Sequence, residues 1–192
     1  MIKTLIETDN SFLTVQTYSS IELLEECVKD VESKLLVKPK ICIYGKEATQ
    51  HRNIGFFSDE SIGYRYSNQL AKSQALTSVL KKLLDEVNEL YEADFNGILI
   101  NKYVDGNDYI GKHSDDEKNL SNIGVVSLSY GSTRKFRVRD KKTNKIVKDV
   151  LIKHNQIMHM GGEFQKEFTH EIPIEKKITT QRHSFTFRKH ME

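Results

Sequence analysis

The sequence predicts an α+β domain in which helices precede a run of short β-strands. Apolar residues repeat at helical spacing in two stretches of the first half, and from Gly97 onward short β-like runs alternate with polar turns. Helices followed by strands, without βαβ alternation, indicate a sandwich or barrel. Because the chain has 192 residues, two prolines and no Gly/Ser-rich linker, we expect a single domain over residues 1–192.

Two helices are predicted, from Ile21 to Leu35 and from about Ser73 to Tyr91. Ser19 and Glu22 form a capping-box pattern at the start of the first helix. The inward stripes are Ile21, Leu24, Val28, Val31 and Leu35 in the first helix, and Leu76, Leu80, Leu83, Val87 and Leu90 in the second. The aromatic, irregular stretch from Lys40 to Ser67 suits short strands and a mobile surface loop.

The second half contains seven β-like runs bounded by polar turns. They are Gly97–Val104, Val125–Tyr130, Lys135–Arg139, Ile146–Ile152, Gln156–Met160, Glu167–Ile172 and Arg182–Lys189.

Composition restricts the class of protein more than the function. A formal charge of +2 is too balanced to indicate a polyanion-binding protein by itself. Cys27 and Cys42 do not form a disulfide framework, and neither a signal-like apolar run nor a stretch of roughly 20 apolar residues occurs. We therefore expect an intracellular protein with reduced thiols, without a membrane segment, that acts as a monomer.

His113 and Asp115 form a candidate metal-ligand pair. In extended chain, residues two apart project from the same side of the backbone. A second histidine from a distant strand would complete a facial set of two histidines and one carboxylate, which leaves three coordination positions open. Such a pair arises about 0.4 times by chance in a chain of this composition, and a solvated turn is the alternative. Spacing alone does not choose the second histidine.

The last strand alternates strictly between polar and aromatic residues. Arg182, Ser184, Thr186 and Arg188 share one face, and Phe185 and Phe187 take the other. The two arginine Cα atoms are separated by roughly 20 Å of strand, so their guanidinium groups can bracket a small dicarboxylate. The alternative is an edge strand whose arginines lie in solvent.

Asn101 and Tyr103 are candidate pocket residues on the predicted strand Gly97–Val104. They share a face, whereas Ile98 and Ile100 take the other. An amide and a phenol are neutral groups that can orient a carboxylate inside a barrel, although a tyrosine on a strand often only packs.

Three segments together resemble the AlkB family of nucleic-acid dealkylases. The run Asn101–Glu117 resembles its N-x-Y through H-x-D-x-E signature, Met160–Pro173 its second-histidine region, and Arg182–Arg188 its R-x-N-x-T-x-R strand. The order of these motifs and the spacing between them agree with the family over roughly residues 40–189. The sequence departs from the family at Ser184, where Asn is usual, at Gln181, where Pro is common, and at His51, where Pro often precedes Arg52.

The resemblance implies a double-stranded β-helix (jelly-roll) core over residues 97–189, with N-terminal helices packed on it. It implies a lead-in helix within 1–40, and a nucleotide-recognition lid with a supporting helix over 41–96, the lid including His51–Phe57. The implied ligands of iron(II) are His113, Asp115 and His170. The implied 2-oxoglutarate site is Asn101, Tyr103, Arg182, Ser184, Thr186 and Arg188, with O2 as cosubstrate. The implied substrate contacts are Arg52, Tyr64, Tyr66, Ser67, Asp116 and Glu117.

The activity that the resemblance implies is oxidative removal of alkyl groups from bases such as 1-methyladenine and 3-methylcytosine in DNA or RNA. These bases are cationic, so Asp116 and Glu117 would favour them over undamaged bases, the alternative being a solvated acidic turn. Lys135, Arg137 and Arg139 form a basic ridge suited to phosphates, or simply a solvated hairpin. Two other functions remain open: an iron(II)/2-oxoglutarate enzyme acting on a protein or small molecule, and a non-catalytic nucleic-acid-binding module.

Overall fold

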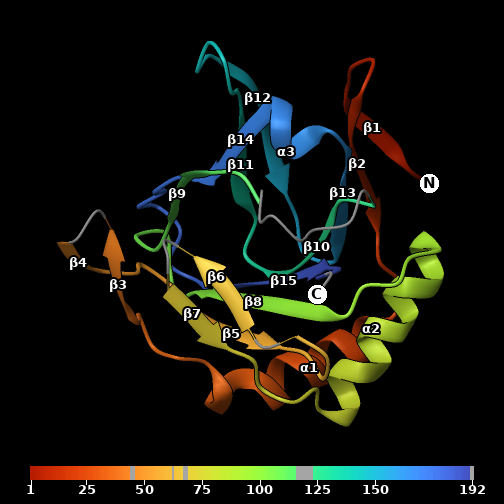
Figure 1. Cartoon of the computed structure of the whole chain (residues 1–192), viewed down its shortest axis with the longest axis vertical. Coiled ribbons are helices and arrows are strands. Elements are labelled where there is room, and N and C mark those ends of the chain that lie inside the picture. The colour runs from red at the N-terminus through yellow and green to blue at the C-terminus, as the bar shows by residue number, and fades with distance from the viewer. Residues whose placement is uncertain (44–45, 62, 67–68, 116–122, 191–192) are drawn as a thin grey trace.

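A computed structural model describes residues 1–43, 46–61, 63–66, 69–115 and 123–190 (Figure 1). Within these residues, a seven-stranded antiparallel sheet, the major sheet, has the order β1-β2-β13-β10-β15-β8-β5. Its strands are β1 (Lys3–Glu7), β2 (Ser11–Thr17), β5 (Asn53–Phe57), β8 (Gly97–Tyr103), β10 (Val125–Gly131), β13 (Gln156–Gly162) and β15 (Arg182–Arg188).

The minor sheet has four strands in the order β12-β11-β14-β9 within the same residues. Its strands are β9 (Ile110–His113), β11 (Arg134–Asp140), β12 (Ile146–Ile152) and β14 (Phe168–Ile172). From β8 to β15 the chain passes back and forth between the two sheets: β8, β10, β13 and β15 lie in the major sheet, and β9, β11, β12 and β14 in the minor sheet. This arrangement is the jelly-roll core expected from the resemblance, and all seven predicted strands are confirmed to within two residues at each end.

Two helices, α1 (Ile21–Val31) and α2 (Ser78–Tyr91), cover the outer face of the major sheet (Figure 1). Thr77 caps the start of α2, because its Oγ1 accepts a hydrogen bond from the Leu80 amide at 3.2 Å. The shared core includes Leu24, Val28, Val31, Leu80, Leu83, Val87, Ile98, Ile100, Phe185 and Phe187. The major sheet therefore presents one apolar face to the helices, and its other face is free to build a site.

The helix ends differ from the prediction. A 3-10 turn, η1 (Glu32–Lys34), follows α1, so the helix stops at Val31 instead of Leu35. Ser20 precedes α1 without a side-chain cap, so the Ser19–Glu22 capping box is wrong. The second helix begins at Ser78, five residues later than predicted. Ile21 and Leu90, both expected inside, are 37% and 46% exposed because each lies at an end of its helix.

The first 40 residues contain more than the expected lead-in helix. β1 and β2 form a hairpin, and β2 pairs with β13 so that Val15 lies opposite Met158. The alternation of buried Ser11, Leu13 and Val15 with less buried neighbours is a strand signal that the sequence contains.

The region expected to be a lid divides into two kinds of structure. Asn53–Phe57, predicted as part of the lid, is the edge strand β5, which pairs with β8, and all five of its residues are buried. Two separate hairpins lie beside the major sheet, β3 (Lys40–Ile43) with β4 (Lys46–Thr49), and β6 (Gly63–Tyr66) with β7 (Gln69–Lys72) (Figure 1). No helix in the described part of the chain is long and apolar enough to cross a bilayer.

Candidate active site

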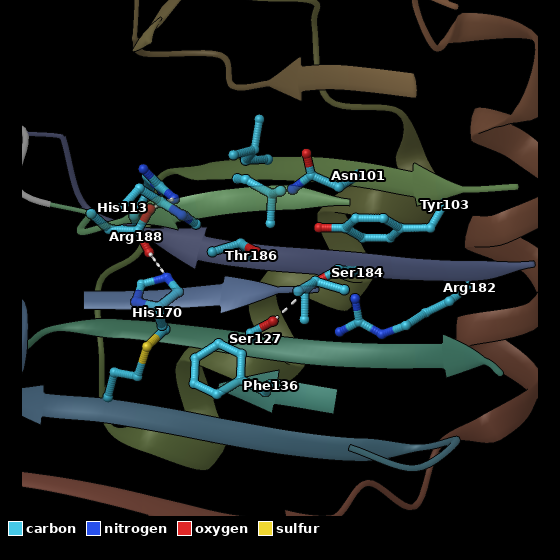
Figure 2. Close-up of a pocket in the computed structure, with 15 residues that line it drawn as sticks. Asn101, Tyr103, His113, Ser127, Phe136, His170, Arg182, Ser184, Thr186 and Arg188 are labelled. Atoms are coloured by element: carbon cyan, nitrogen blue, oxygen red, sulfur yellow. Dashed lines mark hydrogen bonds and ion pairs between the residues drawn. The ribbon is translucent and has the colours of Figure 1, made fainter. Parts of the chain in front are cut away.

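A pocket lies between the two sheets, against the inner face of the major sheet. Figure 2 shows two histidines at one end of this pocket and Arg182 at the other. Its polar lining is Asn101, Tyr103, His113, Asp115, Ser127, His170, Arg182, Ser184, Thr186 and Arg188. Its apolar lining is Leu99, Ile110, Phe136, Met160 and Ile172. The strand alternation predicted for β8 and β15 is therefore confirmed, because their polar faces line the pocket and their apolar faces meet the helices.

His113, Asp115 and His170, which we call the ligand triad, meet at one end of the pocket. One possible ligand atom from each residue lies within 4.8 Å of the others. His113 ends β9, Asp115 follows it, and His170 lies on β14 directly opposite His113 in the strand register. Two imidazoles and a carboxylate on one side of a metal ion are the facial set of iron(II) oxygenases, so the geometry can hold this ion.

A β-bulge aims His113 into the pocket. His170 pairs with His113 and Ile172 pairs with Ile110, so β9 advances three residues while β14 advances two. In a regular strand, residues three apart project from opposite faces. Because of the bulge, Ile110 and His113 both line the pocket.

The tautomer of His113 suits a metal ligand. Its Nδ1 lies 2.8 Å from the carbonyl oxygen of Gly111, which can only accept, so Nδ1 carries the proton. Nε2 is then the lone-pair nitrogen available to a metal. Burial, reinforced by the neighbouring His170, lowers the pKa of His113 to about 3, so the ring is neutral near pH 7.

Asp115 is held as a buried carboxylate. Arg188 donates from Nη2 to its Oδ1 at 3.0 Å, and His170 Nε2 lies 3.5 Å from its Oδ2. Burial alone would raise the pKa of this carboxyl, but the charge of Arg188 and the hydrogen bond with His170 outweigh burial and hold the pKa well below its ordinary value. The carboxylate is therefore ready to bind a cation.

Arg182 fits one carboxylate of a diacid at the far end of the pocket. Its Nη2 donates to Ser129 Oγ at 2.7 Å, whereas Nε and Nη1 are buried without a hydrogen-bond partner among the described residues. Its guanidinium carbon lies 5.4 Å from the centre of the Tyr103 ring. Burial lowers the pKa of Arg182 to about 10, so the group stays charged near neutrality. Two unsatisfied donors on a buried cation match a carboxylate.

Small polar groups line the wall between the two arginines. Ser184, which stands where the AlkB family usually has Asn, lies with its Oγ 3.0 Å from Ser127 Oγ (Figure 2). Asn101 accepts a hydrogen bond from Arg52 Nε at 2.7 Å. Arg52, predicted to contact substrate, is 4% exposed and is not among the residues that line the pocket. Its charge lies close enough to His113 to contribute to the lowered pKa of that ring.

The serines of β10 and the contact between Phe136 and His170 were not predicted. Ser127 and Ser129 share a face of β10 with Val125, a signal that the alternation in Val125–Tyr130 contains. Phe136 stacks on His170 with ring centres 5.0 Å apart. That contact depends on how β11 pairs with β14, which the sequence alone does not give.

The predicted substrate residues are only partly described. Tyr64 and Tyr66 lie on β6, in a hairpin beside the major sheet. Ser67, Asp116 and Glu117 lie outside the described residues.

The basic ridge is largely neutralised within the fold. Arg137 makes two hydrogen bonds to Asp149, at 2.7 and 2.8 Å, and Lys135 lies 3.6 Å from the same residue. Arg139 pairs with Glu171 at 3.0 Å. Because carboxylates on β12 and β14 already pair with these basic side chains, the ridge is better explained as a set of ion pairs within the fold than as a surface that binds phosphates.

Comparisons with known proteins agree with this geometry. The profile of the 2OG-Fe(II) oxygenase superfamily matches residues 11–188. "DNA oxidative demethylase ALKBH2" of Bos taurus is 29% identical over 178 residues, which are 88% of this chain and 63% of the relative. "Alpha-ketoglutarate-dependent dioxygenase alkB homolog 3" of Mus musculus is 33% identical over 119 residues, 57% of this chain and 42% of the relative. The chain thus spans less than two thirds of the length of these two relatives, and they confirm the resemblance to the AlkB family.

The fold also has a solved counterpart. "The structure of OsALKBH1" aligns with a TM-score of 0.59 and 14% identity, over 92% of this chain and 97% of that one. The superfamily works with iron(II), 2-oxoglutarate and O2, the cofactors predicted above. The matched profile covers most of the chain and includes every member of the ligand triad and every arginine of the pocket. The chain belongs to the 2OG-Fe(II) oxygenase superfamily.

Proposed function

We propose that this protein removes alkyl groups oxidatively from N-alkylated bases, such as 1-methyladenine and 3-methylcytosine, in DNA or RNA. The observation that carries the proposal is a pocket in which the ligand triad lies at one end and a buried arginine with two unsatisfied donors at the other. The names of the ALKBH2 and alkB homolog 3 relatives support a nucleic-acid substrate and a dioxygenase reaction. We further propose that it acts inside the cell as a monomer.

In this proposal His113, Asp115 and His170 hold iron(II), and Arg182 binds the far carboxylate of 2-oxoglutarate. When bound, the iron and the diacid supply the oxidation of the alkyl carbon with O2, coupled to decarboxylation of the diacid to succinate. Asn101, Tyr103, Ser184 and Thr186 line the space that the diacid would occupy. Arg188 keeps Asp115 charged and oriented.

The surrounding side chains exclude water and side reactions. Leu99, Phe136 and Met160 give the pocket an apolar wall, and Phe136 fixes the plane of the His170 ring by stacking on it. A dry, pre-oriented site strengthens each charge interaction inside it.

A base within a duplex cannot enter this pocket, so the substrate base is flipped out or already single-stranded. Tyr64 and Tyr66, on the β6–β7 hairpin, are proposed to contact it by stacking, together with Ser67. Asp116 and Glu117 follow Asp115 directly in the chain and are proposed to favour cationic bases.

The test is reconstitution without oxygen with iron(II) and 2-oxoglutarate, followed by exposure to air with methylated DNA and RNA oligonucleotides. Mass spectrometry should show loss of the methyl group, with formaldehyde and succinate released in equal amounts. His113→Ala and Asp115→Ala should abolish turnover. His154→Ala is the matched control, since this exposed histidine does not line the pocket; it accepts a hydrogen bond from the Gly131 amide and packs edge-on against Tyr130.

The same experiment separates the alternatives. Formaldehyde from methylated peptides or amino acids, but not from oligonucleotides, would replace the proposal with a protein or small-molecule oxygenase. Oligonucleotide binding without any turnover in the iron-loaded protein would replace it with a non-catalytic module.

A further inference from the structure

We propose that Gln165 is a positioning residue for the metal ligand Asp115. Its Oε1 accepts a hydrogen bond from the Asp115 backbone amide at 2.9 Å. The inference rests on the ligand triad of the proposed function, and concerns what holds that triad together before any metal binds.

Asp115 needs such support because the sheet does not reach it. β9 ends at His113, and the register with β14 ends at the pair His113–His170. Asp115 therefore lies two residues past the last ladder position. A carboxylate that must meet two imidazoles within a fraction of an ångström requires another contact to fix its backbone.

Gln165 is itself well placed to provide that contact. It lies on the short helix α3 (Phe164–Glu167), whose Phe164 is completely buried between the sheets. The Gln165 Nε2 group points at Met160 Sδ, 3.6 Å away, so the amide is held at both ends. The side chain thus presents its carbonyl oxygen to Asp115 in a fixed direction.

A second contact joins the same two segments. Ser114 donates from Oγ to the carbonyl oxygen of Phe168 at 2.9 Å. Phe168 begins β14, the strand that carries His170. Gln165 and Ser114 therefore clamp the Asp115 backbone to the chain segment that supplies the distal histidine, which sets the separation of the two ligands.

Three variants test the proposal. Gln165→Leu removes the acceptor with little change of volume, and Gln165→Glu keeps an acceptor oxygen at the same reach. Gln156→Leu is the matched control, because Gln156 Oε1 accepts a hydrogen bond from the Lys153 amide at 2.9 Å in the turn before β13, and Gln156 does not line the pocket. Each protein is titrated with Mn(II) without substrate or 2-oxoglutarate, and free Mn(II) is counted by electron paramagnetic resonance.

We expect Gln165→Leu to bind Mn(II) about 10-fold or more weakly, the usual effect of losing a group that orients a ligand. Gln165→Glu should recover most of this loss, and Gln156→Leu should match the wild type. Co(II) should report the same order through its visible spectrum, because a displaced carboxylate changes the coordination geometry. Circular dichroism of the metal-free proteins shows whether each variant is folded.

Unchanged Mn(II) affinity in folded Gln165→Leu would overturn the proposal, as would equal losses in Gln165→Leu and Gln165→Glu. If Gln165→Leu does not fold, Ser114→Ala gives the second measurement: it should also weaken Mn(II) binding, and wild-type affinity would overturn the clamp. Metal affinity is measured without turnover, so this result does not depend on whether oligonucleotides are substrates. Failure of dealkylation by a protein that binds metal as expected would count against the proposed function alone.

Discussion

Arg188 and Asp115 form an ion pair of 3.0 Å in which both side chains are almost completely buried. Replacing Arg188 with Met would leave the carboxylate buried without its cation, so the metal-free protein should lose about 3–5 kcal/mol of unfolding free energy. A bound divalent ion supplies positive charge to Asp115, so the loss should be smaller with Mn(II). Urea denaturation with and without Mn(II) measures both values. Arg137→Met, which breaks an exposed pair, should cost about 1 kcal/mol or less.

The stability of the metal-free protein should fall as the pH falls below about 6.5. The pKa of His113 is lowered from 6.5 to about 3, so in this range the unfolded chain binds a proton that the folded chain does not. The lowered pKa of Asp115 acts in the same direction below about 3.8. Denaturation at several pH values should give a flatter curve for His113→Gln than for the wild type. Parallel curves would contradict a folded-state His113 that stays neutral in this pH range.

Arg182→Met should weaken the binding of 2-oxoglutarate without lowering the free energy of unfolding. The variant loses the charged donors for the far carboxylate of 2-oxoglutarate, so we expect the Kd for this diacid to rise about 10- to 150-fold. It also removes a buried cation with two unsatisfied donors, so the metal-free protein should keep or gain stability. Calorimetric titration of the Mn(II)-loaded protein without oxygen gives the Kd, and Mn(II) affinity itself should not change. An unaltered Kd would assign the far carboxylate to another residue.

Arg137→Gln should have little effect on the salt dependence of nucleic-acid binding. Arg137 is already engaged by both oxygens of Asp149. A phosphate contact would contribute about 0.9 to the slope of log K against log salt concentration, and the variant should change that slope by far less. Fluorescence anisotropy with a methylated duplex at several salt concentrations measures it. A change near the full value would restore the phosphate-tracking interpretation of the ridge.

The inner faces of β8 and β15 could be predicted because a strand has a period of two. Once Phe185 and Phe187 are assigned to the core, Arg182, Ser184, Thr186 and Arg188 must face the other way. The His113–Asp115 pair could be recognised in the same way. The sequence spacing did not select His170, since its approach to His113 depends on the pairing of β14 with β9; the family resemblance selected it.

Other features depend on partners that are distant in sequence. The bulge that turns His113 inward exists only relative to β14, so no local pattern predicts it. The resemblance implies that His51–Phe57 belongs to a lid, yet Asn53–Phe57 is buried in the strand β5, because it pairs with β8, which is distant in sequence. Gln165 lies in the stretch Met160–Pro173 that resembles the family's second-histidine region, but its contact could not be predicted, because the partner is the backbone amide of a residue 50 positions earlier.

The most direct test is a crystal structure of the protein loaded with Mn(II) and 2-oxoglutarate without oxygen, with the metal located by anomalous diffraction. We predict one strong peak within coordination distance of His113 Nε2, Asp115 and His170, with the diacid extending from it to Arg182. A peak elsewhere, or a diacid that does not reach Arg182, would contradict the account.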